Sequence, residues 1–282
     1  MKTGLVLEGG AMRGMFTAGV IDVLMENDIP FDGAIGTSAG AGFGCNYKSR
    51  QIGRVIRYNK KYCRDKRYVS VWSLIKTGDL YGADFVYREL PDNLDPFDVD
   101  TFSSSPMEFY VTCTDIVTGQ AVYHKCDKGD AKDILWMRAS ASMPLASRIV
   151  EIDGLLLSDG GMADSIPLRH FQEIGYDRNV VVLTQPYDYE KKRNRLMPVL
   201  RMVYRKYPKF IEALETRHER YNETVEYIKE LEKAGDIFVI RPPKALEIGA
   251  VEHDPCQLQR VYEIGRAQAT NKLDDLKAYL KE

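Results

Sequence analysis

The chain has 282 residues, and its 39 Lys and Arg nearly balance its 41 Asp and Glu, for a formal net charge of −2. Such a balance gives no global field that would attract nucleic acid, so we expect no nucleic-acid partner. The amino terminus, MKTGLVLEGG, has no apolar stretch of signal-peptide length, and no later stretch approaches the roughly 20 apolar residues that cross a bilayer. We therefore expect a cytoplasmic protein. An apolar content of 44% is typical of globular proteins.

The first predicted elements alternate between strand, glycine turn and helix. Residues 3–7 form a short β-prone run, and residues 14–26 carry apolar side chains at helical spacing. A second strand is expected over residues 31–35 and a helix from Ala41 onward. This alternation favours an α/β fold, a three-layer α/β/α arrangement with a mainly parallel central sheet.

The later elements extend this pattern toward the carboxyl terminus. Strands are predicted over residues 108–113, 120–124, 154–157, 180–184 and 237–241, and helices over residues 131–140, 212–234 and 255–280. No linker-like segment separates these pieces. We therefore expect a catalytic core over residues 1–186 and a mostly helical extension, residues 187–282, packed on the same domain.

The cysteines indicate neither a disulfide framework nor a zinc site. They are five in number and have no CxxC spacing, so we expect most of them to be small core residues. Their positions are Cys45, Cys63, Cys113, Cys126 and Cys256. We expect no metal and no cofactor.

The stretch Gly36-Thr37-Ser38-Ala39-Gly40 has the G-x-S-x-G pattern of a nucleophile elbow. In such an elbow a serine sits on a strained turn between a strand and a helix, and small neighbours let the two elements approach each other. Gly36 and Gly40 would supply that clearance. Taken alone the pattern is also compatible with an ordinary glycine-rich turn.

A second glycine turn, residues 8–14, lies one βα unit before Ser38. A serine that attacks an ester creates an oxyanion, which backbone N–H groups at a helix amino terminus can stabilise. Gly9, Gly10 and Ala11 are the candidate donors, and Arg13 and Gly14 continue the loop.

The same loop also fits a dinucleotide fingerprint with its middle glycine replaced, through Gly9, Ala11 and Gly14. That alternative needs an acidic residue about 20 positions on, and Asp28 and Asp32 are only loosely placed for it.

A serine nucleophile needs a base within hydrogen-bond reach. The four histidines have no local signature of catalysis; they are His124, His170, His218 and His253. Asp159 is better placed, because it follows the apolar run 155–157 and precedes Gly160 and Gly161, at the end of a predicted strand. The alternative for Asp159-Gly160-Gly161 is a simple turn.

The glycine loop with its basic residue, the G-x-S-x-G and the D-G-G, in this order, resemble the patatin-like phospholipase family. The resemblance implies a Ser38–Asp159 dyad, an oxyanion hole near Gly9, Gly10 and Ala11, and a lipid acyl ester as substrate. Residues 138–144 resemble the family's short Ser-rich helix that ends at a proline. The resemblance is specific from Gly4 to about Pro186.

Two positions depart from the family pattern. Ala11 stands where the family loop usually has a third glycine, and Asp164-Ser165-Ile166-Pro167 stands where members often have Asn-x-Pro. An alanine with positive φ would be strained and would reshape the oxyanion hole. A catalytically weak or inactive protein that binds lipid or a partner is therefore an alternative to the hydrolase.

Lysines and arginines alternate with Met, Leu, Tyr and Phe from Lys191 to Phe210. Such a stretch suits an anionic lipid surface, and it predicts a peripheral membrane contact. It is also compatible with a solvated helix whose apolar stripe packs on the core. The oligomeric state is open.

Overall fold

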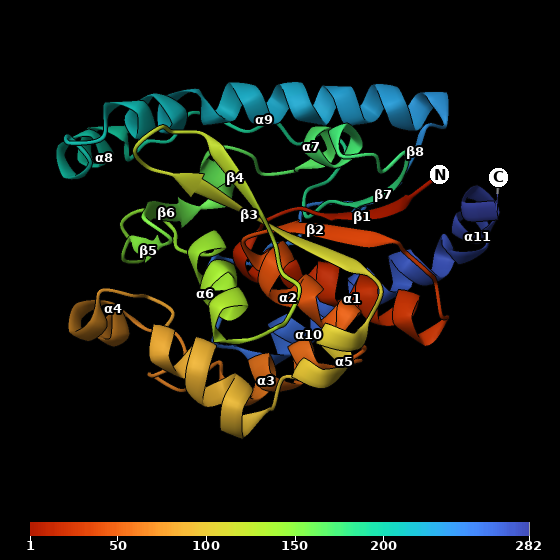
Figure 1. The fold of residues 1–282 in the computed structure, drawn as a ribbon, viewed down its shortest axis with the longest axis horizontal. Coiled ribbons are helices and arrows are strands. Elements are labelled where there is room, and N and C mark those ends of the chain that lie inside the picture. Colours follow the sequence, from red (N-terminus) through yellow and green to blue (C-terminus); the bar gives the residue numbers. More distant parts are fainter. Residues whose placement is uncertain (282) are drawn as a thin grey trace.

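The computed structural model describes residues 1–281, which fold into three layers around one eight-stranded sheet (Figure 1). The order of the strands is β5-β6-β3-β2-β1-β7-β8, and β4 pairs with β3. The strands are β1 (Thr3–Leu7), β2 (Gly33–Thr37), β3 (Glu108–Asp115), β4 (Ala121–Lys125), β5 (Val150–Ile152), β6 (Leu155–Asp159), β7 (Arg178–Val182) and β8 (Ile237–Ile240). The pairings among β3, β2, β1, β7 and β8 are parallel, so the α/β fold with a mainly parallel sheet is confirmed.

Helices cover both faces of the sheet (Figure 1). The α-helices are α1 (Gly14–Glu26), α2 (Ala39–Lys48), α3 (Arg54–Tyr62), α4 (Val71–Thr77), α5 (Val99–Ser104), α6 (Ala131–Ser140), α7 (Leu168–Glu173), α8 (Met197–Val203), α9 (Pro208–Ala234), α10 (Pro255–Asn271) and α11 (Leu273–Lys281). Short 3-10 turns, η1 (Ala11–Arg13) and η3 (Gly160–Met162), follow β1 and β6, and a π-helix, η2, spans Phe85–Leu94. Helices α7 and α9 lie on one face, and α1, α2, α6 and α10 lie on the other (Figure 1).

The helices α1 and α10 cross at very close range. A Cβ atom on Gly19 would lie 2.0 Å from the carbonyl oxygen of Tyr262, and one on Gly265 would lie 2.0 Å from that of Phe16. Only glycine fits at such a crossing. The helix α10 therefore closes one layer of the fold, although it is more than 200 positions from α1 in the sequence.

The strands β2 and β6 approach each other end to end along the same edge of β3. Thr37, the last residue of β2, is in register with Thr112 of β3. The next residue of β3, Cys113, is in register with Asp159, the last residue of β6, which runs antiparallel to β3. The carboxyl ends of β2 and β6 therefore meet at one point of the sheet.

Several predicted boundaries were wrong. The predicted helix over residues 255–280 is two helices, because the chain turns at Lys272, whose ammonium group donates to the carbonyl of Val239 at 2.9 Å. The Ser-rich segment 138–144 is helical only to Ser140, where α6 ends. The helix α9 begins at Pro208, earlier than predicted, because proline suits the first turn of a helix.

Candidate active site

Ser38 occupies the turn that joins β2 to α2. Its backbone has φ 55° and ψ −120°, a strained conformation for a residue with a side chain. Its small neighbours are needed for clearance: a Cβ atom on Gly36 would lie 2.4 Å from the carbonyl oxygen of Gly40, and one on Gly40 would lie 2.4 Å from that of Leu7. The turn thus presents the Ser38 side chain at the carboxyl end of the sheet.

The structure brings Ser38 and Asp159 together. Ser38 Oγ donates to Asp159 Oδ2 at 2.7 Å, and the N–H of Gly161 donates to Asp159 Oδ1 at 2.8 Å. Burial raises the pKa of Asp159, and the Ser38 hydrogen bond and the positive charge of Arg217 only partly oppose this effect. A carboxylate that is destabilised by burial is a stronger base than one in water.

The backbone of Asp159 is held from three sides. Its N–H donates to the carbonyl of Ser142 at 2.9 Å, and its carbonyl accepts from Thr114 Oγ1 at 2.8 Å. A Cβ atom on Gly160 would lie 2.1 Å from the carbonyl oxygen of Thr112, so β3 approaches this turn too closely for any other residue. These contacts fix the direction of the Asp159 carboxylate.

The segment after this turn braces the Ser38 turn as well. The carbonyl of Asp164 accepts from Thr37 Oγ1 at 3.2 Å, and its carboxylate accepts from Tyr123 OH at 2.9 Å. Ser165 Oγ donates to the carbonyl of Gly161 at 2.9 Å. Asp164 and Ser165, which replace the Asn-x-Pro of the family pattern, thus tie the two turns together.

The glycine loop lies against Ser38. A Cβ atom on Gly9 would lie 3.1 Å from that of Ser38, and the N–H of Gly9 reaches the carbonyl of Ser165 at 3.4 Å. Within residues 1–281 the N–H groups of Gly10 and Ala11 donate to no other residue. Ala11 has φ 46°, a left-handed conformation that costs about 1–2 kcal/mol for a residue with a side chain. The third position of the loop thus keeps a glycine-like backbone although it is alanine.

Arg13 and Gly14 complete the loop. A Cβ atom on Gly14 would lie 2.9 Å from that of Ala39 and 2.8 Å from the ring of Phe43, so glycine lets α1 pass the start of α2. Arg13 borders the same cavity as Ser38, and its buried Nε atom has no hydrogen-bond partner in the described part of the chain.

The acidic residues that a dinucleotide site would need lie at the wrong end of the sheet. Asp32 precedes β2, and its carboxylate accepts from the N–H of Thr3 at the start of β1 at 2.7 Å. Asp28 pairs with Arg50. Ligands of open α/β sheets bind at the carboxyl ends of the strands, so neither acid can meet a ribose beside the glycine loop.

Two further residues, Ser140 and Glu8, shape the site, and sequence reasoning gave neither a role. Ser140 Oγ accepts from the N–H of Ser38 at 2.8 Å and donates to the carbonyl of Thr112 at 2.6 Å. Glu8 is buried and accepts from the N–H of Thr184 at 2.5 Å and from Tyr221 OH at 2.7 Å. Ser140 thus occupies the N–H of Ser38, and Glu8 anchors the start of the glycine loop.

Two cavities of opposite character meet at Ser38. The first, about 120 Å³, runs between α2 and α6 and is mostly apolar; Phe43, Tyr58, Val86, Leu90, Phe97 and Met137 are among its walls. The second, about 270 Å³, is bordered by the glycine loop, Asp159 and the start of α9. Both cavities are bordered by Ala11, Ser38 and Met143.

Three positively charged side chains line the second cavity: Arg13, Lys191 and Arg217. None of them forms an ion pair with a described Asp or Glu. Arg217 Nε donates to the carbonyl of Gly161, and Lys191 Nζ lies 4.1 Å from the centre of the Tyr221 ring. Burial, with Arg217 and Arg13 nearby, lowers the pKa of Lys191 to about 8. Buried cations that have no ion-pair partner favour the binding of an anionic ligand.

No histidine borders the two cavities that meet at Ser38 in the described chain. His124 stacks on Trp136 and His170 stacks on Tyr123, with ring centres 4.2 Å and 3.6 Å apart. The carboxylate of Asp159 is therefore the base that the geometry offers to Ser38.

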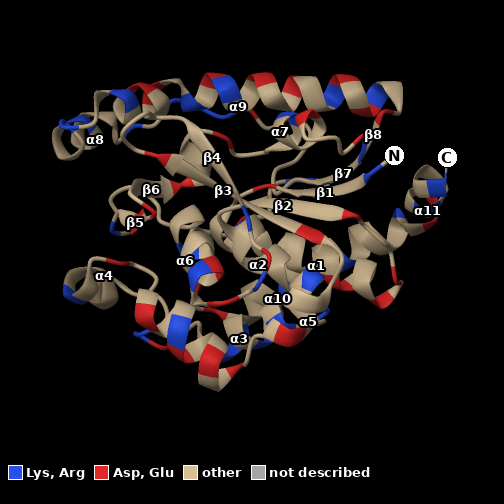
Figure 2. Cartoon of the chain, viewed as in Figure 1, with Lys and Arg blue, Asp and Glu red and all other residues tan. Residues whose placement is uncertain are grey.

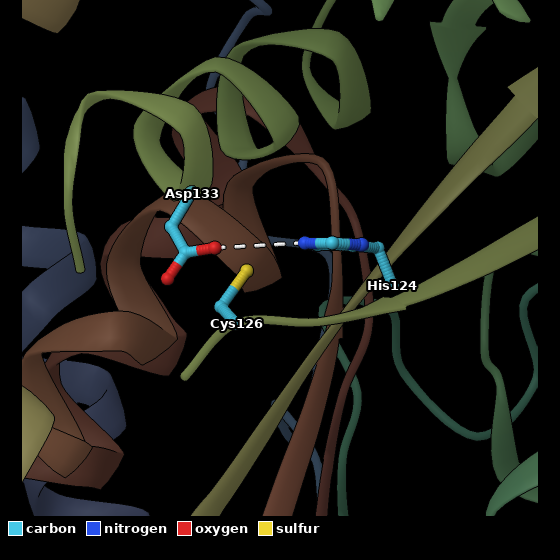
Figure 3. A group of neighbouring side chains, drawn as sticks. All are labelled: His124, Cys126 and Asp133. Carbon is cyan, nitrogen blue, oxygen red and sulfur yellow. Dashed lines mark ion pairs between the residues drawn. The ribbon is translucent and has the colours of Figure 1, made fainter. Parts of the chain in front are cut away.

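His124, Cys126 and Asp133 form a compact group that borders neither of the cavities at Ser38 (Figure 3). Their ligand-type atoms lie within 4.8 Å of one another, and His124 Nε2 is 3.5 Å from Asp133 Oδ1. The other carboxylate oxygen accepts the N–H groups of residues 128 and 129. Burial raises the pKa of Cys126, and Lys48 Nζ lies 3.5 Å from its carbonyl oxygen. The group packs His124 against Asp133 at a distance that allows an ion pair when the imidazole is protonated.

Comparison with known proteins places these residues in a family context. A family model described as "Patatin-like phospholipase" matches residues 5–171, and one described as "Domain of unknown function (DUF6363)" matches residues 207–281. Uncharacterized protein YjjU of Escherichia coli is 28% identical, over 94% of this chain and 75% of its own. Lysophospholipase nte1 of Emericella nidulans is 31% identical, over 62% of this chain and 11% of its own, so the chain spans about a tenth of that relative.

A solved structure, VipD from Legionella pneumophila, superposes with a TM-score of 0.48 at 13% identity, over 97% of this chain and 67% of that one. Among residues 1–281 no helix combines the length and the hydropathy that crossing a bilayer requires.

Proposed function

The chain belongs to the patatin-like phospholipase family, and from this premise we propose that it is a serine acyl hydrolase that cleaves lipid esters with a Ser38–Asp159 dyad. The observation that carries the proposal is the 2.7 Å hydrogen bond from Ser38 Oγ to a buried carboxylate, at the point where an apolar and a cationic cavity meet. The name of the nte1 relative, a lysophospholipase, supports the substrate class.

The proposed reaction is acyl transfer in two steps. Asp159 takes the hydroxyl proton while Ser38 Oγ attacks the ester carbonyl carbon, and the protonated Asp159 then gives that proton to the leaving alkoxide. Water attacks the acyl-serine with Asp159 again as base, which releases the fatty acid and restores the hydroxyl group of Ser38. The raised pKa of Asp159 suits both roles, because it makes the carboxylate more basic and the carboxyl group easier to keep protonated.

The oxyanion of each tetrahedral intermediate would be held by the N–H groups of Gly10 and Ala11. Of the three candidate donors these two remain free to donate, whereas the N–H of Gly9 faces Ser165; the N–H of Ser38 is bound to Ser140. Donors that are already oriented before the charge develops need no reorganisation, and each contributes roughly 3–4 kcal/mol in known hydrolases. The positive φ of Ala11 is the strain that this arrangement maintains.

The two cavities suggest how an amphiphile would bind. An acyl chain would occupy the apolar cavity between α2 and α6, and an anionic head group would face Lys191 and Arg217. A lysophospholipid, with one chain and one phosphate, has this division of character.

We further propose that residues 1–186 form the catalytic core and that the extension, residues 187–282, completes the site through Lys191 and Arg217. Two further points stay predictions from the sequence. They are the contact with a lipid surface through Lys191 to Phe210 and a cytoplasmic location at the membrane periphery.

A fluorophosphonate probe, which reacts with activated serines, tests the proposal. We expect the purified protein to be labelled, Ser38→Ala to lose all labelling, and Asp159→Asn to be labelled far more slowly. Ser147→Ala is the matched control, because Ser147 borders the apolar cavity and forms no hydrogen bond with Ser38 or Asp159. Fatty-acid release from lysophosphatidylcholine would then be measured on the same four proteins.

A wild-type protein that folds but is neither labelled nor active would overturn the hydrolase and favour the alternative, a protein of the same fold that binds lipid or a partner without cleaving it.

A further inference from the structure

Two short helices at one end of the molecule expose large apolar side chains. In α4, Val71 is 66% exposed, Trp72 49% and Ile75 82%; in and beside α8, Leu196 is 55% exposed, Val199 41%, Met202 67% and Val203 53%. Scattered single residues of this kind need no explanation, whereas two clusters at the same end of the molecule indicate an interaction site.

The segment 143–149 lies between the two helices and forms a hydrogen bond just beyond the end of each. The N–H of Leu80, just after α4, donates to the carbonyl of Ala146 at 2.8 Å, and Tyr204 OH, at the end of α8, accepts from the N–H of Leu145 at 3.3 Å. Ile149, at the end of the segment, is also exposed. The helices α4 and α8 lie at the same end of the longest axis (Figure 1).

This surface lies at the end of the molecule where the site opens. The strands β1 and β2 run toward it from the labelled amino terminus (Figure 1). Met143 borders both cavities that meet at Ser38, Leu145 borders the cationic one, and Leu196 and Leu200 border it from the α8 side. A molecule held on this surface would therefore have a short path to Ser38.

The three segments of the surface carry an excess of Lys and Arg, although Arg201 pairs with Glu215 of α9 and the exposed Glu151 follows the segment 143–149. Residues 191–207 contain seven Lys and Arg and no Asp or Glu, and residues 70–78 and 143–149 add Lys76 and Arg148, again without an acidic residue. Figure 2 shows Lys and Arg gathered around α8. Such a cationic rim around apolar side chains is complementary to an anionic lipid bilayer.

A second copy of this chain fits the surface poorly. A two-fold symmetric dimer would place the same patch on both subunits, and cations would then face cations.

We propose that α4, residues 143–149 and α8 form one docking surface for an anionic lipid bilayer, into which Trp72, Ile75 and Met202 insert. The surface extends the contact predicted for residues 191–210 to α4, which supplies the most exposed apolar side chain. Its use in presenting lipid to Ser38 rests on the proposed hydrolase, whereas binding itself does not.

The experiment uses the full chain with Ser38→Ala, so that no lipid is consumed, and vesicles of phosphatidylcholine with or without roughly one third phosphatidylglycerol. Sedimentation should show binding to the anionic vesicles that falls as NaCl rises. Ile75→Asp and Met202→Asp should each weaken it at least about tenfold. Ile52→Asp is the matched control, because Ile52 is 42% exposed and follows the far end of α2.

Tryptophan fluorescence gives a second readout. Trp72 is exposed and Trp136, the other tryptophan, is already buried, so a blue shift on vesicle addition reports Trp72. We expect the shift with anionic vesicles and its loss in Trp72→Phe.

Absence of binding, or binding that Ile75→Asp and Met202→Asp leave unchanged, would overturn the proposal. A dimer that Ile75→Asp dissociates would overturn it in favour of a second copy as the occupant. In proteins that retain Ser38, Ile75→Asp should hydrolyse a water-soluble short-chain ester at the wild-type rate but lose activity on vesicles. Vesicle binding without any ester hydrolysis would refute the proposed function alone.

Discussion

Asp159→Asn separates the proposed base from its role in holding the turn. Asp159 Oδ1 accepts the N–H of Gly161 at 2.8 Å, so the carbonyl oxygen of Asn must take that place, because two N–H donors cannot face each other. The amide NH2 group then takes the place of Oδ2, which lies 2.7 Å from Ser38 Oγ, and donates to the hydroxyl oxygen. The Ser38 proton is left without an acceptor while the geometry is kept.

We expect Asp159→Asn to lower kcat greatly without lowering the stability of the fold. Removal of the base itself, a histidine in known serine hydrolases, lowers kcat by about 2 × 10⁶, which corresponds to roughly 8.6 kcal/mol of transition-state stabilisation. Burial raises the folded-state pKa of Asp159 above its unfolded value, so the stability it contributes is full at low pH and is lost as pH rises through the raised pKa. The neutral Asn loses nothing over that window, and its Tm at pH 8 should equal or exceed that of the wild type.

The assay is steady-state hydrolysis of a short-chain ester, with Tm measured on the same samples at pH 5 and pH 8. Ser38→Ala gives the background rate. An Asn variant that keeps more than about a tenth of the wild-type kcat would refute the argument, because another group would then be taking the proton. A large fall in Tm would show instead that the carboxylate mainly holds the turn.

Three further outcomes follow from the geometry. Activity on a neutral ester should rise with pH as Asp159 loses its proton. Activity on an anionic lysophospholipid should rise in the same way and then fall near pH 8, because Lys191 loses its charge there. Rates measured against pH for the two substrates check this, and Lys191→Arg should move the fall to higher pH. Gly42→Leu should stabilise α2 by about 0.8 kcal/mol, because leucine has the higher helix propensity and a Cβ atom at Gly42 meets nothing within 4 Å. The leucine side chain would lie beside the apolar cavity, so the variant should prefer short acyl chains to long ones. Values of kcat/KM for esters of different chain length test this preference. Gly36→Ala should lower the free energy of unfolding, measured in urea, by at least about 2 kcal/mol, because its Cβ atom would lie 2.4 Å from a backbone oxygen. Gly42→Ala is the control and should cause no such loss. Equal urea midpoints for the two variants would contradict this prediction.

The candidate residues could be singled out from the sequence because each lies at the end of a predicted strand, with a glycine one or two positions later. Ser38 and Asp159 stand at such ends, and the chain order of their motifs matches the family pattern. The direction of β6 could not be predicted, since an antiparallel strand has no sequence mark that distinguishes it from a parallel one. Yet that direction is what brings Asp159 to the end of β2.

The remaining parts of the site were hidden for other reasons. Arg217 is one of several cations along a 27-residue amphipathic helix, and nothing in its neighbours distinguishes the one that faces the cavity. The segment between α2 and β3 gave no clear period, because Pro91 interrupts η2 and α4 exposes the apolar side chains that a core helix would bury. Tertiary contacts rather than local propensity hold these elements.

The two cavities set limits on a substrate that the family alone does not. The apolar cavity, about 120 Å³, and the cationic one, about 270 Å³, both reach Ser38. A single acyl chain that enters the first cavity leaves its ester at the serine and its head group in the second. A second acyl chain would have to lie against Lys191 and Arg217, where an apolar group would desolvate two cations without replacing their hydrogen bonds. For the proposed hydrolase we therefore expect amphiphiles with one chain and one anionic head to be the preferred substrates.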